Sequence, residues 1–213
     1  MSKAALFSKM LQVFVLARRV NHYYWLHTDA HGADESVSVE NLQKIIGRLA
    51  QLRIRKLLVD FEGTSLRGNV ERYEDRVEIH VRKSLSDSWR RFTVVKELCH
   101  LLLDGEEDWS VDVVTTIADL LAFSGFSGEE TAEIRSEKLA EIMALELIYP
   151  IEDRRPDLAS IADGKKISEI AASRKIPAIW IERGLNEDYL AACEGTWKAL
   201  VSVPDEHNGL PDE

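Results

Sequence analysis

No long apolar run occurs anywhere in the 213-residue sequence. A helix that crosses a membrane needs ~18 or more consecutive apolar residues. The nearest candidate, residues 4–17, is interrupted by Lys9 and Gln12 and followed by Arg18 and Arg19, which is typical of an amphipathic helix and not of a signal peptide. We therefore expect no membrane partner.

Cysteine is scarce as well, and basic residues are fewer than acidic ones. The sequence has two cysteines, Cys99 and Cys193, and a chain of this length buries roughly 70% of the surface that its unfolded form exposes, so its core needs no disulfide. This cysteine usage fits a reducing cytosol, and we expect a cytoplasmic protein. With 27 Lys and Arg against 37 Asp and Glu, the net charge is -10, which argues against direct nucleic-acid binding.

A short region in the first half of the sequence alternates between apolar and polar residues. Residues 77–81 read Val-Glu-Ile-His-Val, and a period of two is typical of a strand with one buried face. Two further short apolar segments precede it, at 57–59 and around Val70. Together the three segments predict a small sheet, which we interpret as a three-stranded meander.

The rest of the sequence follows the helical period of three to four residues. Ser38 is placed to cap one helix, Ser86 or Asp87 another, and Pro150 ends a long one. The predicted helices cover residues 4–26, the segment after Ser38, 86–103, 111–123, 129–149 and, beyond a break at 154–156, much of 158–197. Helices before and after a small sheet predict an α+β fold. We divide the chain into an N-terminal helix (1–36), a core domain (37–151), a C-terminal helical region (152–202) and a tail expected to be disordered (203–213).

One predicted helix carries residues with catalytic chemistry. Because a helix turns about 100° per residue, positions 96, 97 and 100 fall within one sector of its surface. In the pattern H-E-x-x-H such a sector holds two zinc-binding imidazoles and a glutamate that activates the bound water. Here the pattern reads Lys96, Glu97, two intervening residues and His100, so that a lysine replaces the first histidine.

The surroundings of this pattern resemble the ImmA/IrrE family of zincin-like metallopeptidases, which typically shows R-F-T-x-x-H-E-x-x-H-x-L-L followed by E-x-x-A-x-x-F-A-x-x-L-L-x-P. The resemblance covers residues 45–150, and the positions of the second motif that this chain keeps are Glu137, Ala140, Ala144, Leu147 and Pro150. It implies a zincin-like core in which His100 and Glu137 are metal ligands and Glu97 is the general base. The family's usual partners are helix-turn-helix repressors, which the peptidase cleaves.

Lys96 departs from that family at the first zinc ligand. A protonated amine has no lone pair for a metal, and catalytic zinc normally has three protein ligands, so we expect the remnant site to be vacant. If the site binds metal, the missing ligand would have to come from Cys99, from Glu141 or from elsewhere in the chain. Otherwise Lys96 either replaces the metal charge between Glu97 and Glu137, which would relieve their mutual repulsion, or extends to the surface.

Other histidines and one helical segment have alternative interpretations. His80 lies on the opposite face of its strand from the apolar residues, where it is either a surface residue or part of a groove to which a peptide adds as a strand. His22, His27 and His31 lie near a helix end, where imidazoles interact favourably with the helix dipole, and a metal site there is the alternative. Residues 166–181 have a helix-turn-helix rhythm, but their apolar and acidic character favours packing over DNA binding.

These observations leave three functions open. The first is a catalytically inactive pseudo-peptidase that regulates by binding a protein, such as a helix-turn-helix repressor, and needs no cofactor. The second is an active, zinc-dependent endopeptidase with an atypical ligand set, in which Glu97 activates the bound water. The third is an acidic component of a larger assembly that binds a basic partner.

Overall fold

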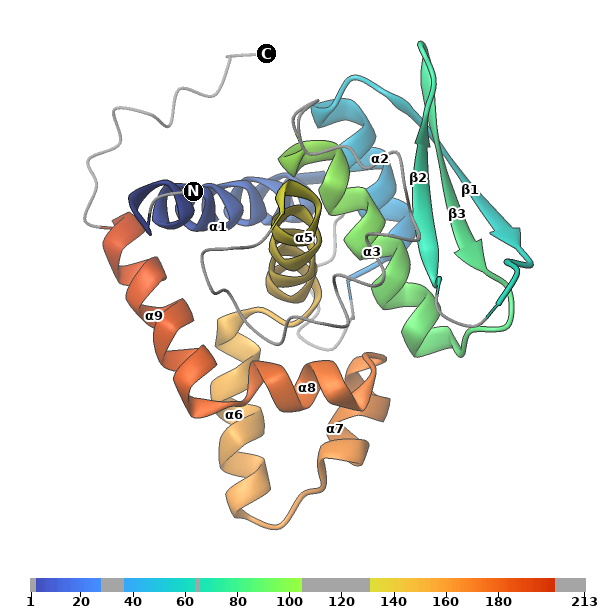
Figure 1. Cartoon of the computed structure of the whole chain (residues 1–213). Coiled ribbons are helices and arrows are strands. Elements are labelled where there is room, and N and C mark those ends of the chain that lie inside the picture. The colour runs from blue at the N-terminus through green and yellow to red at the C-terminus, as the bar shows by residue number, and fades with distance from the viewer. Residues whose placement is uncertain (1–2, 28–36, 64–65, 105–130, 202–213) are drawn as a thin grey trace.

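The computed structural model (Figure 1) describes residues 3–27, 37–63, 66–104 and 131–201. Within these ranges the fold is α+β, as predicted, with eight helices and one three-stranded sheet. The elements in chain order are α1 (Lys3–His27), α2 (Val39–Leu49), β1 (Arg53–Val59), β2 (Gly68–Arg72), β3 (Arg76–Arg82), α3 (Asp87–Leu103), α5 (Ala132–Ile148), α6 (Ile151–Ala162), α7 (Ile167–Arg174), α8 (Ala178–Gly184) and α9 (Glu187–Val201). The helix predicted at 111–123, the tail at 203–213 and His31 lie outside the described residues.

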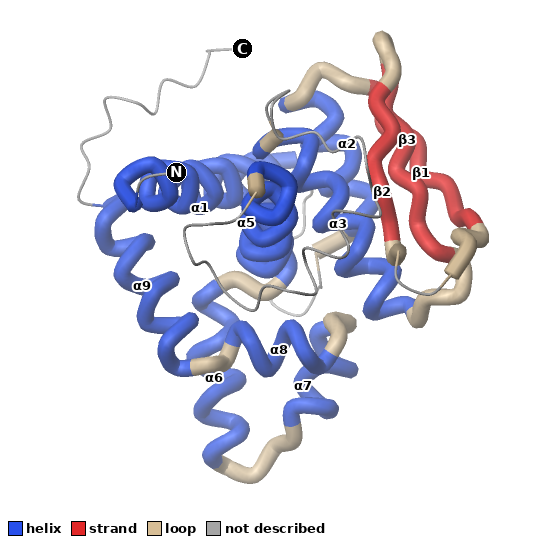
Figure 2. Tube along the Cα trace, viewed as in Figure 1, coloured by secondary structure: helices blue, strands red, loops and turns tan. Residues whose placement is uncertain are grey.

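The sheet is mixed, and the predicted meander is wrong. The strand order is β1-β3-β2, in which β3 is antiparallel to β2 but parallel to β1. Strand β3 lies in the centre of the sheet, and its Val77, Ile79 and Val81 are all buried. The five-residue β2 has one apolar side chain, Val70, which suits an edge strand. Figure 2 shows the three strands gathered on one side of the helices.

One face of the sheet lies against α3, and α3 in turn packs on α5. In Figure 1, α5 is seen nearly end-on between α1 and α3. Twelve of its 17 residues are buried, as expected for a helix that neighbours surround. Thus α3 lies between the sheet and the most buried helix, and its side chains meet both. In the described part of the chain, no helix combines the length and the hydropathy that crossing a membrane requires.

The helix starts follow the predicted caps. Ser38 and Ser86 accept hydrogen bonds from backbone N–H groups at the first turns of α2 and α3, and Thr131 does the same for α5. These caps fix where the chain enters α3 and α5, the two helices that carry the predicted site residues.

The break predicted at residues 154–156 is wrong, because these residues lie inside α6. Pro156 removes one backbone donor from that helix. In the same helix, the fully buried Arg154 reaches back to α5 and its end: its Nη2 lies 2.6 Å from Glu146 Oε1, and its Nε donates to the Tyr149 carbonyl at 2.8 Å. The C-terminal helices are therefore joined to the core by a buried ion pair.

Candidate functional site

The sector predicted on α3 faces α5. Lys96 and His100 lie one turn apart on α3, and both contact Glu137 of α5. The Lys96 Nζ is 2.6 Å from Glu137 Oε2, and the His100 Nε2 is 3.2 Å from Glu137 Oε1. One carboxylate thus bridges two cationic side chains, and the structure brings together four residues that the sequence singled out, since Glu97 also contacts Lys96.

Lys96 points inward and does not extend to the surface. Its side chain is only 15% exposed, and its Nζ lies 3.0 Å from Glu97 Oε1 in addition to the Glu137 contact. Burial by itself would lower the pKa of Lys96, but the carboxylates of Glu137 and Glu97 outweigh that effect and raise the pKa above its usual value. Burial alone would raise the pKa of Glu137, yet Lys96 and His100 hold it well below its usual range.

His100 is held from its other side by two residues that the sequence did not indicate. Its Nδ1 lies 2.9 Å from Asp104 Oδ2 and 3.0 Å from Ser136 Oγ, and the Ser136 hydroxyl donates to Asp104 Oδ1 at 2.6 Å. Burial would lower the pKa of His100, but the Glu137 charge and the Asp104 contact raise it to about 10, so the ring is an imidazolium at neutral pH. The sequence does contain signals for both residues: Asp104 lies one helical turn after His100, and Ser136 directly precedes Glu137.

The donor set does not fit a zinc ion. Two buried atoms, Glu97 Oε1 and His100 Nε2, accept or donate no hydrogen bond and make only the ion-pair contacts given above. Such atoms suit a metal centre, but His100 lies between the carboxylates of Glu137 and Asp104, which favour its protonated form, and an ammonium occupies the space beside Glu137. Zinc needs a neutral imidazole and, at a catalytic site, three protein ligands, whereas these residues provide at most two.

The edge strand β2 lies directly on the helix that carries the site. A Cβ atom added to Gly68 would lie 2.6 Å from Thr93 Cγ2 and 3.1 Å from Glu97 Oε1, so only glycine allows this approach. Farther along β2, the Arg72 Nη2 donates to the His100 carbonyl at 3.0 Å. The sheet therefore covers the α3 side of the cluster with backbone and an arginine.

The remaining predicted site residues do not join this cluster. Cys99 is fully buried in the hydrophobic core, where burial raises the pKa of its thiol. Glu141 contacts Arg183 of α8 at 3.4 Å, and burial raises the pKa of its carboxyl. His80 lies on the face of the sheet that points away from α3, as its alternation with buried residues predicted, and on α1 His22 and His27 are exposed.

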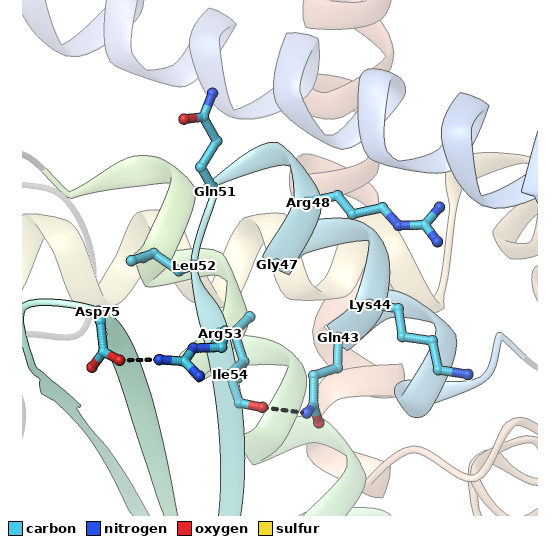
Figure 3. A pocket seen from close by; sticks show the side chains of 9 residues that line it. All are labelled: Gln43, Lys44, Gly47, Arg48, Gln51, Leu52, Arg53, Ile54 and Asp75. Carbon is cyan, nitrogen blue, oxygen red and sulfur yellow. Dashed lines mark hydrogen bonds and ion pairs between the residues drawn. The ribbon is translucent and has the colours of Figure 1, made fainter.

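An open depression of about 740 Å³ lies elsewhere, between the end of α2 and the start of β1 (Figure 3). Three of its polar side chains are already engaged, since Gln43 donates to the Ile54 carbonyl at 3.0 Å and Arg53 pairs with Asp75. None of the predicted site residues lines it.

No protein-family model matches the chain, and neither a curated protein nor a solved structure matches it. The residues of the cluster and the sequence pattern around them are therefore the features that bear on function.

Proposed function

We propose that this chain is an ImmA/IrrE-like protein in which Lys96 has replaced the catalytic metal, and that it regulates by binding a protein without cleaving it. The observation that carries the proposal is the position of the Lys96 ammonium, 2.6 Å from Glu137 and 3.0 Å from Glu97. In the family pattern these two carboxylates are the glutamate ligand and the general base. The ammonium now contacts both of them and offsets part of their negative charge.

This substitution removes the chemistry that peptide hydrolysis needs. A catalytic zinc ion polarises the scissile carbonyl and lowers the pKa of its bound water to about 7. A lysine ammonium has no open coordination position, and it engages the Glu97 oxygen that would accept the water's proton. We therefore infer that the fold is retained for recognition.

The partner class follows from the resemblance and from the sheet edge. We infer a regulator such as a helix-turn-helix repressor, the usual partner in the resembling family. Among the described strands β2 pairs only with β3, and it packs on the helix that carries the cluster. An extended segment of a partner that pairs with the outer edge of β2 would lie beside the cluster.

The first test is metal content, measured by mass spectrometry after incubation with zinc and removal of the excess. The chain is compared with Lys96→His, and both carry His80→Gln so that the separate imidazole on the sheet contributes nothing. We expect the chain without the Lys96 change to be empty and Lys96→His to hold close to one zinc per chain. Stoichiometric zinc in the former would overturn the proposal and favour the active peptidase with an atypical ligand set.

The second test separates binding from cleavage. Candidate helix-turn-helix repressors are incubated with the chain in the presence of zinc or manganese, and complexes and fragments are both measured. We expect a complex and no fragments. Metal-dependent fragments that disappear with Glu97→Gln would contradict the proposal, because they require Glu97 to act as a general base.

A further inference from the structure

We propose that Glu71, Glu78 and His80, here called the sheet-face cluster, bind a divalent metal ion of the zinc class on the face of the sheet that points away from α3. This site is separate from the cluster around Lys96, and the proposal does not rest on the proposed function. Each of the three residues offers one ligand atom, and these atoms lie within 4.8 Å of one another.

The backbone holds the three side chains on one face. Glu71 of β2 and Glu78 of β3 are directly paired across the antiparallel strands, and His80 follows Glu78 by two residues on β3. Residues two apart on a strand, and residues paired across strands, point to the same side of a sheet. The placement therefore comes from the central strand and its neighbour and not from a loop.

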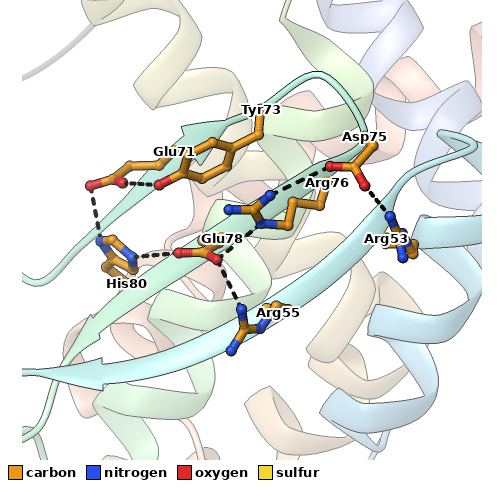
Figure 4. Close-up of polar contacts among 8 residues, drawn as sticks. All are labelled: Arg53, Arg55, Glu71, Tyr73, Asp75, Arg76, Glu78 and His80. Atoms are coloured by element: carbon orange, nitrogen blue, oxygen red, sulfur yellow. Dashed lines mark hydrogen bonds and ion pairs between the residues drawn. The ribbon is translucent and has the colours of Figure 1, made fainter.

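Each carboxylate has one oxygen held by a protein donor and the other directed at His80 (Figure 4). Glu78 Oε1 accepts from Arg76 at 3.2 Å and from Arg55 at 3.3 Å, while its Oε2 lies 3.6 Å from His80 Nε2. Glu71 Oε2 accepts from the Tyr73 hydroxyl at 2.9 Å, while its Oε1 lies 3.1 Å from His80 Nδ1. Ligands of bound metals are oriented by outer donors in the same way.

The ligand types and spacing favour zinc. One imidazole with two carboxylates suits zinc and related transition metals, whereas calcium and magnesium prefer oxygen ligands alone. Zinc bonds of about 2.0 Å in a tetrahedron separate ligand atoms by about 3.3 Å. Each carboxylate already lies near that distance from one ring nitrogen, Glu71 from Nδ1 at 3.1 Å and Glu78 from Nε2 at 3.6 Å, and the three ligand atoms lie within 4.8 Å of one another. An ion takes one ring nitrogen, and the Glu71 side chain, which is 43% exposed, is free to turn toward it.

The neighbouring arginines leave room for a cation. Of the two Glu78 oxygens, Arg55 and Arg76 contact Oε1 and leave Oε2 to His80. Asp75 pairs with both Arg76 and Arg53. Part of their positive charge is thus offset within the sheet. Three protein ligands leave a fourth position for water or for a side chain of a binding partner.

The test is a titration of the metal-free full chain with Zn²⁺ by calorimetry, and with Co²⁺ by its visible absorption, which reports tetrahedral coordination. We expect saturation at one equivalent at micromolar protein concentration. His80→Gln and Glu71→Gln should each abolish that binding, and Tyr73→Phe should weaken it about tenfold because it removes an outer donor. His22→Gln, which removes an exposed imidazole from α1, should leave it unchanged.

Two results would overturn the proposal. One is the absence of binding at that concentration, which would leave His80 as a hydrogen-bonding bridge between the two carboxylates. The other is binding that persists unchanged in His80→Gln. Because Glu71 and His80 lie on the sheet face that points away from α3 and outside the hydrophobic core, circular dichroism should show that each variant keeps its fold.

Discussion

Replacing Lys96 with methionine tests whether its charge stabilises the cluster. Methionine keeps most of the length of the side chain and removes the ammonium that lies 2.6 Å from Glu137 and 3.0 Å from Glu97. Removing one partner of a buried ion pair costs about 3–5 kcal/mol, because the other charge is left uncompensated. His100 remains 3.2 Å from Glu137, so we expect the lower end of that range.

The expected loss is therefore about 3 kcal/mol, which corresponds to a fall in Tm of about 6–12 °C for a chain of this size. Equilibrium unfolding in urea at pH 7.5, followed by circular dichroism, measures it. The double variant Lys96→Met/Glu137→Gln is the control, because it removes the carboxylate that the first change leaves unpaired. It should recover at least about 1 kcal/mol relative to the single variant.

Either of two results would refute this reasoning. If Lys96→Met changes stability by less than about 0.5 kcal/mol, the ammonium contributes no more than an ordinary surface side chain. If the double variant is as unstable as the sum of both single variants, the lysine and Glu137 are not coupled.

Three further predictions concern packing, a second buried charge and pH. Gly68→Ala should destabilise the protein by about 1–3 kcal/mol because the new methyl group overlaps side chains of α3. Gly195→Ala is the control: it has open space around it in α9 and should stabilise the protein by up to about 1 kcal/mol. Urea unfolding measures both. Arg154→Met should cost about 3–5 kcal/mol in the same assay because it leaves Glu146 buried without its partner, and a neutral result would contradict that role. The raised pKa of His100 adds stability that is fully present below its usual pKa of 6.5 and is lost as the pH rises toward about 10. The free energy of unfolding should therefore fall by up to about 1.4 kcal/mol per pH unit between these two values. If the same slope is measured in His100→Gln, the ring is not its source.

Helical spacing was sufficient to place the α3 residues of the cluster on one face of that helix. Positions 96, 97 and 100 share a sector of any regular helix, and the structure directs all three side chains inward. The residues around them were not predictable in the same way. Asp104 caps the end of α3 and Ser136 belongs to α5, and both reach His100 only through the tertiary structure. The direction of Lys96 was also open in the sequence, since a long side chain can reach either solvent or a carboxylate.

The strands were located by their apolar residues, but their order was not. Alternation shows which face of β3 is buried and says nothing about its neighbours. A parallel β1 beside β3 depends on how the intervening segment crosses over, and local residue types do not encode that path. Similarly, the two arginines before Pro156 indicated a break in the sequence pattern because charged residues are rarely buried. Only the structure shows that Arg154 is buried against Glu146 inside a continuous helix.

The contact between α1 and α9 has a consequence for synthesis of the chain. Phe14 of α1 is fully buried and lies edge-on to Trp197 of α9, with 5.3 Å between ring centroids, and α1 also packs on α5. At a translation rate of about 5–20 residues per second, the apolar side of α1 waits on the order of 10 to 35 seconds for these late elements. During that interval α2 is available to pack on α1, but the side of α1 that α5 and α9 later cover stays exposed in the nascent chain. The packing of α1 is therefore complete only after α9 has been made.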